Sequence, residues 1–174
     1  MASPVSPDIR ETEAGDAAAL ASLHARAFPD EDLRPLVASL LSGPVDVLSL
    51  TVRERRAPVA HVVFTPCGGE GRDALLGPLA VLPGRQGRGL GSALVRAGLD
   101  MLRDRGTDHV FVLGDPAYYA RFGFAPERET AAPFDLPEAW RDAWQSLTLS
   151  DAPAPKAKRL AVPEPWRDPA LWGA

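Results

Sequence analysis

Hydrophobic residues recur with helical spacing in several stretches of the chain. Two short stretches lie between residues 16 and 41, where Pro29 ends the first pattern and Gly43-Pro44 ends the second. A longer stretch starts at Leu90 and continues with Ala93, Leu94, Ala97, Met101 and Leu102. This spacing predicts an amphipathic helix that packs one apolar stripe against a core.

Runs rich in β-branched and leucine residues predict strands between these helices. The predicted strands are residues 9–12, 45–53, 59–65, 74–81 and 109–113. The second and third runs read as a hairpin, because Arg55-Arg56-Ala57-Pro58 separates them. The last run follows the long helix and is expected to lie parallel to residues 74–81. Residues 127–150 are expected to supply the final strands, with Trp140 and Trp144 among the candidates for the core or for the wall of the acceptor site.

The length and the proline distribution predict one domain with an extension. A chain of 174 residues that is 45% hydrophobic can bury a single core, and we assign this domain to residues 8–150. Five prolines in residues 151–174 predict irregular extended chain. Trp166 and Trp172 make this extension too apolar for a free tail, so we expect it to dock on the domain or on a second subunit of a homodimer.

Charge and composition disfavour several classes of partner. The net charge of -4 argues against a protein that binds nucleic acid by neutralising phosphates. The chain has no apolar run of membrane-spanning length, and its first residues lack the features of a signal peptide, so we expect a cytoplasmic protein without a membrane partner. A single cysteine, Cys67, gives neither a disulfide framework nor a zinc set, so no metal is expected.

A glycine-rich segment, residues 82–92, joins the predicted strand 74–81 to the long helix. Gly87, Gly89 and Gly91 let backbone amides approach a ligand and allow positive φ where the loop turns. The first amides of the following helix have no partner within the helix, and the helix dipole is positive at that end. The segment therefore predicts a phosphate site, to which Arg85 and Arg88 add positive charge.

Two other phosphate-binding loops fit this segment less well. A nucleotide-hydrolysing P-loop has lysine after its second conserved glycine, whereas Leu90 follows Gly89 here. A dinucleotide fingerprint fails at Ser92 and would need more sequence after it for the remaining βαβ units. Asp108 does stand at a plausible distance for the acidic residue of that fingerprint, so the dinucleotide alternative remains open at this point.

The pattern Gln86-x-x-Gly89-x-Gly91, followed by a helix, a strand and Tyr119-Ala120-Arg121-Phe122-Gly123-Phe124, resembles the GNAT superfamily of N-acetyltransferases. The resemblance covers about residues 75–126, and residues 114–119 are similar to a bacterial branch of small predicted acetyltransferases. It implies a single-domain α/β fold. The expected sheet is mixed and mostly antiparallel, with helices on both faces and a splayed central pair of parallel strands.

The resemblance also implies acetyl-CoA as the cosubstrate. The implied pyrophosphate site comprises Gln86, Gly87, Arg88, Gly89, Leu90, Gly91 and Ser92. The pantetheine arm would bond to the strand backbone of Leu79, Ala80 and Val81, next to a strand interruption at Gly77-Pro78. Asp115 would cap a short helix near the cosubstrate, with Pro116 in its first turn.

Tyr119 matches the family tyrosine that resembles a general acid. Tyr118 is the adjacent alternative, and packing in the core or the cleft wall is the other role open to either ring. The chain departs from the commoner family pattern, in which an asparagine stands several residues further upstream of the tyrosine. We therefore expect the helix before Tyr119 to be short.

The expected reaction is direct transfer of an acetyl group from acetyl-CoA to a primary amine of a small molecule, protein or peptide. The amine must lose a proton, and the departing thiolate must gain one. Residues 74–81 carry no carboxylate, where many relatives have glutamate, so deprotonation through water is expected, with His61 or Glu70 as further candidates for the base. His61 shares a strand face with Val59 and Val63, which favours a packed or half-exposed histidine of the sheet over a base. The alternative function is a non-catalytic acyl-CoA-binding or regulatory module.

Overall fold

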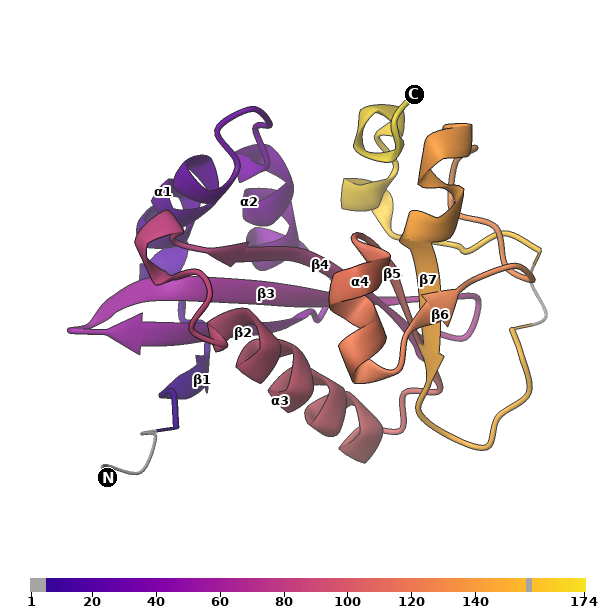
Figure 1. Cartoon of the computed structure of the whole chain (residues 1–174), viewed down its shortest axis with the longest axis horizontal. Helices are drawn as coiled ribbons and strands as arrows, with labels where there is room; N and C mark the ends of the chain where they lie inside the picture. Colours follow the sequence, from indigo (N-terminus) through magenta and orange to yellow (C-terminus); the bar gives the residue numbers. More distant parts are fainter. Residues whose placement is uncertain (1–5, 156–157) are drawn as a thin grey trace. The chain divides into compact units, whose positions relative to one another are not determined.

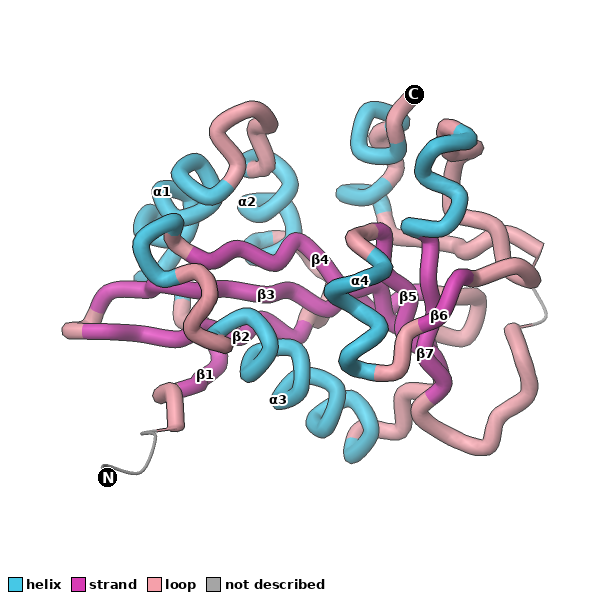
Figure 2. The backbone as a smooth tube through the Cα atoms, in the orientation of Figure 1, coloured by secondary structure: helices cyan, strands magenta, loops and turns pink. Residues whose placement is uncertain are grey.

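The computed structural model describes residues 6–155 and 158–174 and has an α/β fold (Figures 1 and 2). The strands are β1 (Ile9–Glu11), β2 (Leu48–Glu54), β3 (Ala57–Cys67), β4 (Asp73–Val81), β5 (His109–Leu113), β6 (Ala125–Pro126) and β7 (Trp144–Thr148). The α-helices are α1 (Ala17–Ala27), α2 (Arg34–Ser42), α3 (Leu90–Asp104) and α4 (Pro116–Tyr119). Short 3₁₀ helices occupy Ala14–Asp16, Pro83–Arg85, Ala120–Phe122, Glu138–Ala143, Glu164–Trp166 and Pro169–Trp172.

The strands form a mixed sheet in the order β1-β2-β3-β4-β5-β7-β6. The pairs β1–β2, β5–β7 and β6–β7 are antiparallel, and β4–β5 is parallel. The expected fold class, with its parallel pair formed by the strands on either side of α3, is confirmed. The parallel register runs from Asp73↔His109 to Leu76↔Val112. Gly77, with a φ of +138°, follows immediately and is succeeded by Pro78, which has no amide hydrogen for pairing.

The chain divides into two compact units. The first comprises residues up to 63 together with 78–98, and the second comprises residues 64–77 and 99–174. In the first unit, α1 and α2 lie on one side of the strands and the start of α3 lies on the other (Figure 1). Leu20 and Leu23 of α1 pack on Ala80 of β4, and Phe28 and Leu82 extend this cluster. Burial of such side chains contributes about 1.5 to 3 kcal/mol each, which holds α1 against the sheet.

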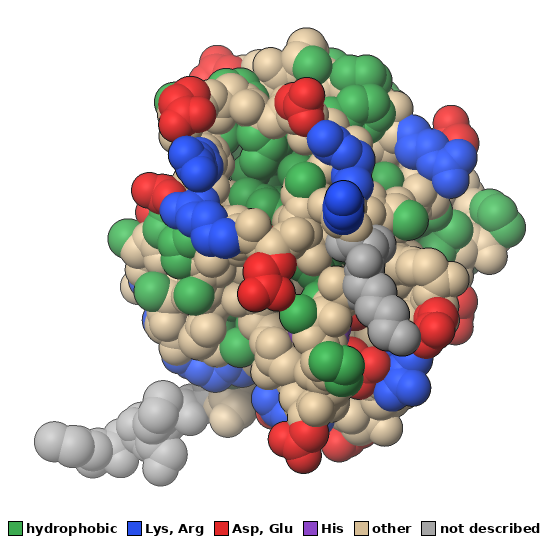
Figure 3. Space-filling view, turned by 90° about the vertical axis from the view of Figure 1, so that its right-hand side faces the viewer, with side chains coloured by type: hydrophobic (Ala, Val, Ile, Leu, Met, Phe, Trp, Pro, Cys, Tyr) green, Lys and Arg blue, Asp and Glu red, His purple; other side chains and the backbone are tan. Residues whose placement is uncertain are grey.

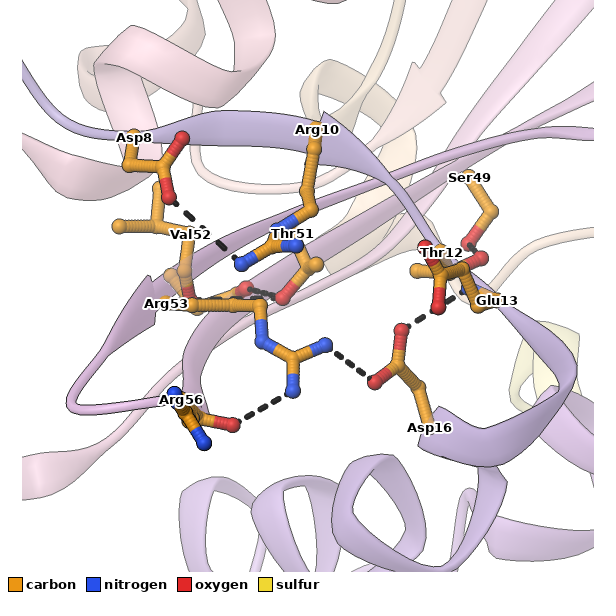
Figure 4. Close-up of polar contacts among 11 residues, drawn as sticks. Asp8, Arg10, Thr12, Glu13, Asp16, Ser49, Thr51, Val52, Arg53 and Arg56 are labelled. Carbon is orange, nitrogen blue, oxygen red and sulfur yellow. Dashed lines mark hydrogen bonds and ion pairs between the residues drawn. The ribbon is translucent and has the colours of Figure 1, made fainter.

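Asp16 precedes α1, as the sequence predicts, but its carboxylate does not cap that helix. The Glu13 amide donates to Asp16 Oδ2 at 2.9 Å, and the Arg53 guanidinium donates to Oδ1 at 2.6 Å (Figure 4). The buried carboxylate thus ties the entry to α1 to strand β2. The prediction of a helix start was right, whereas the expected cap was wrong because the half-buried Arg53 guanidinium offers the stronger, charge-assisted contact.

The second unit is organised around β5, which pairs with β4 on one side and with β7 on the other. Trp144 of β7 is buried and stacks on Phe111 of β5, with ring centroids 5.5 Å apart. Trp140 lies in the preceding 3₁₀ helix and is 40% exposed, so Trp144 is a core residue, whereas Trp140 keeps only the acceptor-wall alternative, which stays a prediction.

Residues near the carboxyl end of the chain pack within the second unit. Trp172 is 1% exposed, and its indole nitrogen donates to the Trp166 carbonyl at 2.9 Å. Trp166 is also buried, and its indole nitrogen donates to Thr65 Oγ1 at 3.0 Å. The Gly68 amide donates to the Ala161 carbonyl at 2.9 Å. These contacts satisfy both indole donors, which buried tryptophans generally require. The boundary at residue 151 stays a prediction, and residues 156–157 lie outside the described chain.

Charges of both signs are interspersed on the face drawn in Figure 3. The second unit pairs Arg159 with Asp135 at 2.7 Å and Arg128 with Asp142. Such exposed pairs contribute about 1 kcal/mol or less. Across residues 6–155 and 158–174, every helix is too short or too polar to cross a membrane.

Candidate functional site

The glycine-rich loop belongs to the first unit and connects β4 to α3. Gly87 and Gly89 have φ values of +73° and +77°, a backbone region that side-chain-bearing residues rarely adopt. Gly91 instead lies within α3. The expected positive φ is therefore found at Gly87 and Gly89 but not at Gly91. A Cβ added at Gly87 or Gly89 would meet no atom within 4 Å. The backbone conformation, rather than crowding, therefore requires glycine at these two positions.

The loop is followed directly by the amino terminus of α3. The Ala93 amide donates to the Gly89 carbonyl at 2.9 Å, which opens the hydrogen-bond ladder of the helix. The amides of Leu90 and Gly91 precede this bond and have no acceptor within the helix. The first turn contains no acidic side chain, so nothing on the helix itself competes with an anionic ligand there.

Two side chains brace the loop against neighbouring strands. The Gln86 side-chain amide donates to the Val81 carbonyl at 3.2 Å, so the loop folds back on the end of β4. Arg85 Nε donates to Glu54 Oε2 at 2.6 Å, and this pairing neutralises the first of the two predicted phosphate cations. Arg88 is exposed, and no ion pair to it is seen within the described residues. Arg88 is therefore the loop cation that is available to a ligand.

The strand segment predicted to hold the pantetheine arm alternates in burial. Ala80 is buried beneath α1, whereas Leu79 and Val81 are half-buried. The Leu82 amide donates to the Val59 carbonyl of β3 at 2.9 Å, which fixes the end of β4 to its neighbour. This segment stays a predicted ligand site.

Tyr119 ends α4 in the second unit. The Asp115 carboxylate accepts from the Ala117 amide at 2.9 Å, so the predicted cap of this short helix is confirmed. The Tyr119 ring is 8% exposed and packs edge-on against Phe124, with centroids 5.7 Å apart. A Cβ on Gly114 would lie only 2.4 Å from Tyr119 Cε2, so the ring rests directly on the glycine backbone. Burial raises the pKa of Tyr119, which keeps its hydroxyl protonated at neutral pH.

Tyr118 has a different environment from its neighbour. It is half-exposed, and the Arg121 guanidinium carbon lies 4.3 Å from the centre of its ring. This cation–π contact occupies one face of the ring. Removal of the Tyr118 hydroxyl is therefore a suitable control for removal of the Tyr119 hydroxyl.

His61, a candidate base, lies in the interior of the first unit with none of its surface exposed. Its Nε2 is 2.8 Å from Ser49 Oγ, and its Nδ1 is 2.8 Å from Nε2 of the equally buried His24. Burial, followed by the neighbouring His24, lowers the pKa of His61 to about 3, and burial lowers that of His24 to about 4. Because both ring nitrogens of His61 are bonded within the chain, it cannot accept a proton from a substrate by direct contact.

Sequence reasoning missed this buried pair. The signal present in the sequence is a serine and a histidine on the two facing strands of a predicted hairpin, twelve residues apart. Glu70, the other candidate base, lies exposed in the loop between β3 and β4. Burial, with a smaller effect from Asp73, raises the pKa of Cys67, so this cysteine remains a thiol. Within the part of the chain that the structure describes, no cluster of three or more His, Cys, Asp or Glu residues could hold a metal ion.

Asp108 has a structural role that removes the basis of the dinucleotide alternative. Its Oδ1 accepts from the Ser150 hydroxyl at 2.6 Å, and its Oδ2 lies 2.9 Å from Arg72 Nε. The Ser150 hydrogen bond, together with Arg72, lowers the pKa of Asp108. The carboxylate thus joins the turn before β5 to the loop before β4.

Comparison with known proteins identifies the family. Residues 17–124 match the acetyltransferase (GNAT) family. The chain is 35% identical over 170 residues to the uncharacterized N-acetyltransferase YjhQ of Escherichia coli K12, and the match covers 92% of this chain and 94% of that protein.

Two solved structures carry ligands that bear on the site. The Escherichia coli GNAT family N-acetyltransferase YhbS in complex with CoA has a TM-score of 0.84 at 27% identity, covering 97% of this chain and 96% of that one. A GNAT family acetyltransferase from Brucella melitensis in complex with acetyl-CoA has a TM-score of 0.74 at 29% identity, covering 91% and 96%.

The family match spans most of the chain and includes the glycine-rich loop and Tyr119. Together with the YjhQ relationship, it decides between the phosphate-loop alternatives that the sequence leaves open. The chain therefore belongs to the GNAT family and is an acyl-CoA-dependent N-acetyltransferase.

Proposed function

We propose that this protein transfers an acetyl group from acetyl-CoA to a primary amine. The observation that carries the proposal is the loop after β4, in which two left-handed glycines lead into a helix terminus with open amides at Leu90 and Gly91. A pyrophosphate placed there would accept from these amides and meet the cation of Arg88. The CoA and acetyl-CoA complexes of the YhbS and Brucella proteins support this choice of cosubstrate.

The remaining predicted contacts position the acyl donor. The backbone of Leu79, Ala80 and Val81 would hold the pantetheine arm, and Gln86 would fix the loop on the strand end, as its bond to the Val81 carbonyl suggests. The side chain of Ser92 and the capped start of α4 at Asp115 are further predicted binding positions.

The chemistry requires two proton movements. The amine nitrogen attacks the thioester carbonyl carbon, the carbon–sulfur bond breaks, and the nitrogen loses a proton. We assign protonation of the departing sulfur to the Tyr119 hydroxyl. The packing on Gly114 supports this role, because it fixes the position of the ring.

An amine panel tests the proposed reaction. Release of CoA from acetyl-CoA would be measured with ethanolamine, a diamine, an amino sugar and a short peptide with a free amino terminus. Amine-dependent CoA release supports the acetyltransferase, and the preferred amine defines the substrate class. Tight acetyl-CoA binding without release for any amine would favour a non-catalytic acyl-CoA-binding module.

Gly89→Ala is expected to weaken acetyl-CoA binding selectively. At a hundredfold excess over its dissociation constant, acetyl-CoA should stabilise the native protein by about 2.7 kcal/mol, or roughly 5 to 10 °C in Tm. Alanine at a φ of +77° is strained by about 1 to 2 kcal/mol, so the backbone would relax and its amides would turn away from the ligand. Most of the Tm shift should disappear.

Gly84→Ala is the matched control in the same loop. A Cβ at Gly84 meets no atom within 4 Å, and its φ is not positive. The variant should therefore keep the full acetyl-CoA shift in a thermal denaturation series. Equal Tm shifts with acetyl-CoA in the Gly84 and Gly89 variants would show that the pyrophosphate does not bind at this loop.

A further inference from the structure

The second unit contains a cavity of about 460 Å³ that the proposed acetyl transfer does not use. Its lining comes from the loop before β4, the start of β5, residue 130 and residues 152–161. Among the described residues that line it, none belongs to the glycine-rich loop or to α4. Small-molecule sites usually have volumes of about 300 to 1,000 Å³, so this cavity is large enough for a small ligand.

Backbone hydrogen bonds fix the walls of this cavity. The Gly68 amide donates to the Ala161 carbonyl at 2.9 Å, which joins the loop before β4 to the opposite wall. The Leu160 amide donates to the Ala131 carbonyl at 2.9 Å, next to Thr130 in the chain. The lining is therefore held in place by the protein itself and does not need a ligand to form it.

Two buried polar side chains of the lining have an atom without a partner. His109 Nε2 and Thr130 Oγ1 make no hydrogen bond with any residue that the structure describes. His109 is 6% exposed and Thr130 is 1% exposed, and both line the cavity. Buried polar atoms without partners are rare in native proteins, and two of them at one cavity indicate a ligand that pairs with them.

The ring of His109 presents an acceptor. Asp73 Oδ1 lies 2.9 Å from His109 Nδ1, and because a carboxylate can only accept, the proton of the neutral ring is on Nδ1. The unpartnered Nε2 then carries a lone pair, which requires a donor on the ligand. Asp73 Oδ2 lies 2.6 Å from the position of a Cβ on Gly68, so the glycine makes room for this carboxylate.

The charges of the lining favour a cationic ligand. Three carboxylates, Glu70, Asp73 and Asp108, face a single cation, Arg72, among the described residues of the lining. Arg72 Nε lies 2.9 Å from Asp108 Oδ2, so this ion pair has no charge to spare for the other two carboxylates. Across residues 6–155 and 158–174, no group of His, Cys, Asp and Glu side chains could hold a metal ion, so a molecular cation fits better.

The remaining lining is mainly apolar. An apolar wall is formed by Pro153, Pro155 and Leu160. A ligand that fits this cavity therefore combines a positive charge that donates hydrogen bonds with a compact hydrocarbon part, which loses contact with water when it packs on the apolar wall.

We propose that this cavity is a binding site for a small organic ammonium ion with an apolar body. One N–H of the ammonium group donates to His109 Nε2, and a second donates to Thr130 Oγ1. Asp73 and Glu70 balance the positive charge, and the apolar body packs on the apolar wall. The ligand binds without reacting, so the inference does not depend on the proposed acetyl transfer.

Histidine NMR with cyclohexylamine tests the site. Cyclohexylamine is protonated at neutral pH and joins an ammonium group to a compact apolar ring. With ¹⁵N-labelled histidine, at constant pH and ionic strength and without acetyl-CoA, it should shift the ring nitrogens of His109 saturably, with a dissociation constant of about 1 mM or lower. The chain has three histidines, and His24 and His61, both buried in the first unit, are the internal references.

Two related compounds test the chemistry of the ligand. Cyclohexanol has nearly the same shape without the charge, and it should bind at least about tenfold more weakly, because hydrogen bonds to charged groups are the stronger ones. Cyclohexanecarboxylate carries the opposite charge and should leave the His109 signals unchanged.

Three variants test the position of the ligand. Thr130→Val keeps the shape of the side chain and should weaken cyclohexylamine binding about fivefold. It should not lower the Tm of the free protein, because the hydroxyl has no partner to lose. Glu70→Gln removes an exposed charge of the lining and should weaken binding about two- to fivefold. Asp142→Asn is the matched control, because Asp142 is exposed in the same unit and pairs with Arg128 away from this lining. It should bind as the wild type does.

The possible outcomes are distinct. A His109 shift that rises linearly with cyclohexylamine, or equal affinities for cyclohexylamine and cyclohexanol, would overturn the ammonium site. Equal affinities in the Thr130, Glu70 and Asp142 variants would place the ligand outside the cavity and overturn it as well. Because every one of these measurements is made without acetyl-CoA, the proposed acetyl transfer is judged separately by the amine panel.

Discussion

Tyr119→Phe is expected to lower kcat by about 10²- to 10⁴-fold while the dissociation constant of acetyl-CoA stays unchanged. Phenylalanine keeps the ring that packs on Gly114 and Phe124, so the fold around α4 should be preserved. What is lost is the hydroxyl that we assign to protonation of the leaving sulfur. A loss near the lower limit is reasonable because a thiolate is a tolerable leaving group near neutral pH. Rates would be measured under conditions in which chemistry limits turnover.

Two further variants make the Tyr119 result interpretable. Tyr118→Phe removes the neighbouring hydroxyl and should lose little activity. Gly114→Ala keeps both hydroxyls, but its Cβ would lie 2.4 Å from the Tyr119 ring, so the ring must move and part of the rate should be lost. A Tyr119→Phe enzyme with wild-type kcat would leave Tyr119 a packing residue, and a selective loss in Tyr118→Phe would move the acid one residue upstream.

Acidification from pH 7 to pH 5 is expected to remove about 4 kcal/mol from the free energy of unfolding through His24 and His61 alone. Both pKa values lie near or below 4 in the folded chain, against 6.5 for an ordinary histidine. The unfolded chain therefore binds protons that the folded chain cannot. Above pH 6.5 the two histidines cost the folded chain little, because they are mostly neutral in both states. As the pH falls below 6.5, the free energy of unfolding decreases, and this decrease stops only below the pKa values of the folded chain.

Urea denaturation at the two pH values measures this effect. The double variant His24→Gln, His61→Gln should be less stable at pH 7 but should lose most of the difference between pH 7 and pH 5. A wild-type protein that is equally stable at both pH values would show that the two buried rings accept protons without cost.

The local elements of this fold could be predicted because each leaves a periodic pattern in the sequence. The strand predicted at residues 109–113 is β5 in full, and the long helix begins at Leu90 as its apolar stripe indicates. Two glycines of the loop adopt the positive φ that their spacing suggests. The cap at Asp115 was also predictable, since its acceptor and donor are two residues apart.

Contacts between distant residues could not be predicted in this way. Arg85 was expected to face a phosphate, but it pairs with Glu54, 31 residues earlier. The partner of His61 on α1 is 37 residues away, and no local pattern distinguishes a histidine buried in a hydrogen-bonded pair from one at a half-exposed strand position. Trp140 and Trp144 look equivalent in the sequence, yet only Trp144 enters the strand that places its ring on Phe111.

The docking of Trp166 and Trp172 has a consequence for how the protein is made. Thr65 and Trp166 are bonded across 101 residues of sequence, and Gly68 is bonded to Ala161. Contacts of such long sequence separation slow folding, because a large loop must close before they form. On the ribosome, the second unit cannot bury its aromatic core until residue 172 has left the exit tunnel. Until then the nascent chain exposes the apolar surface that these tryptophans later cover, and this is the stage of its synthesis at which it is most open to chaperones and to aggregation.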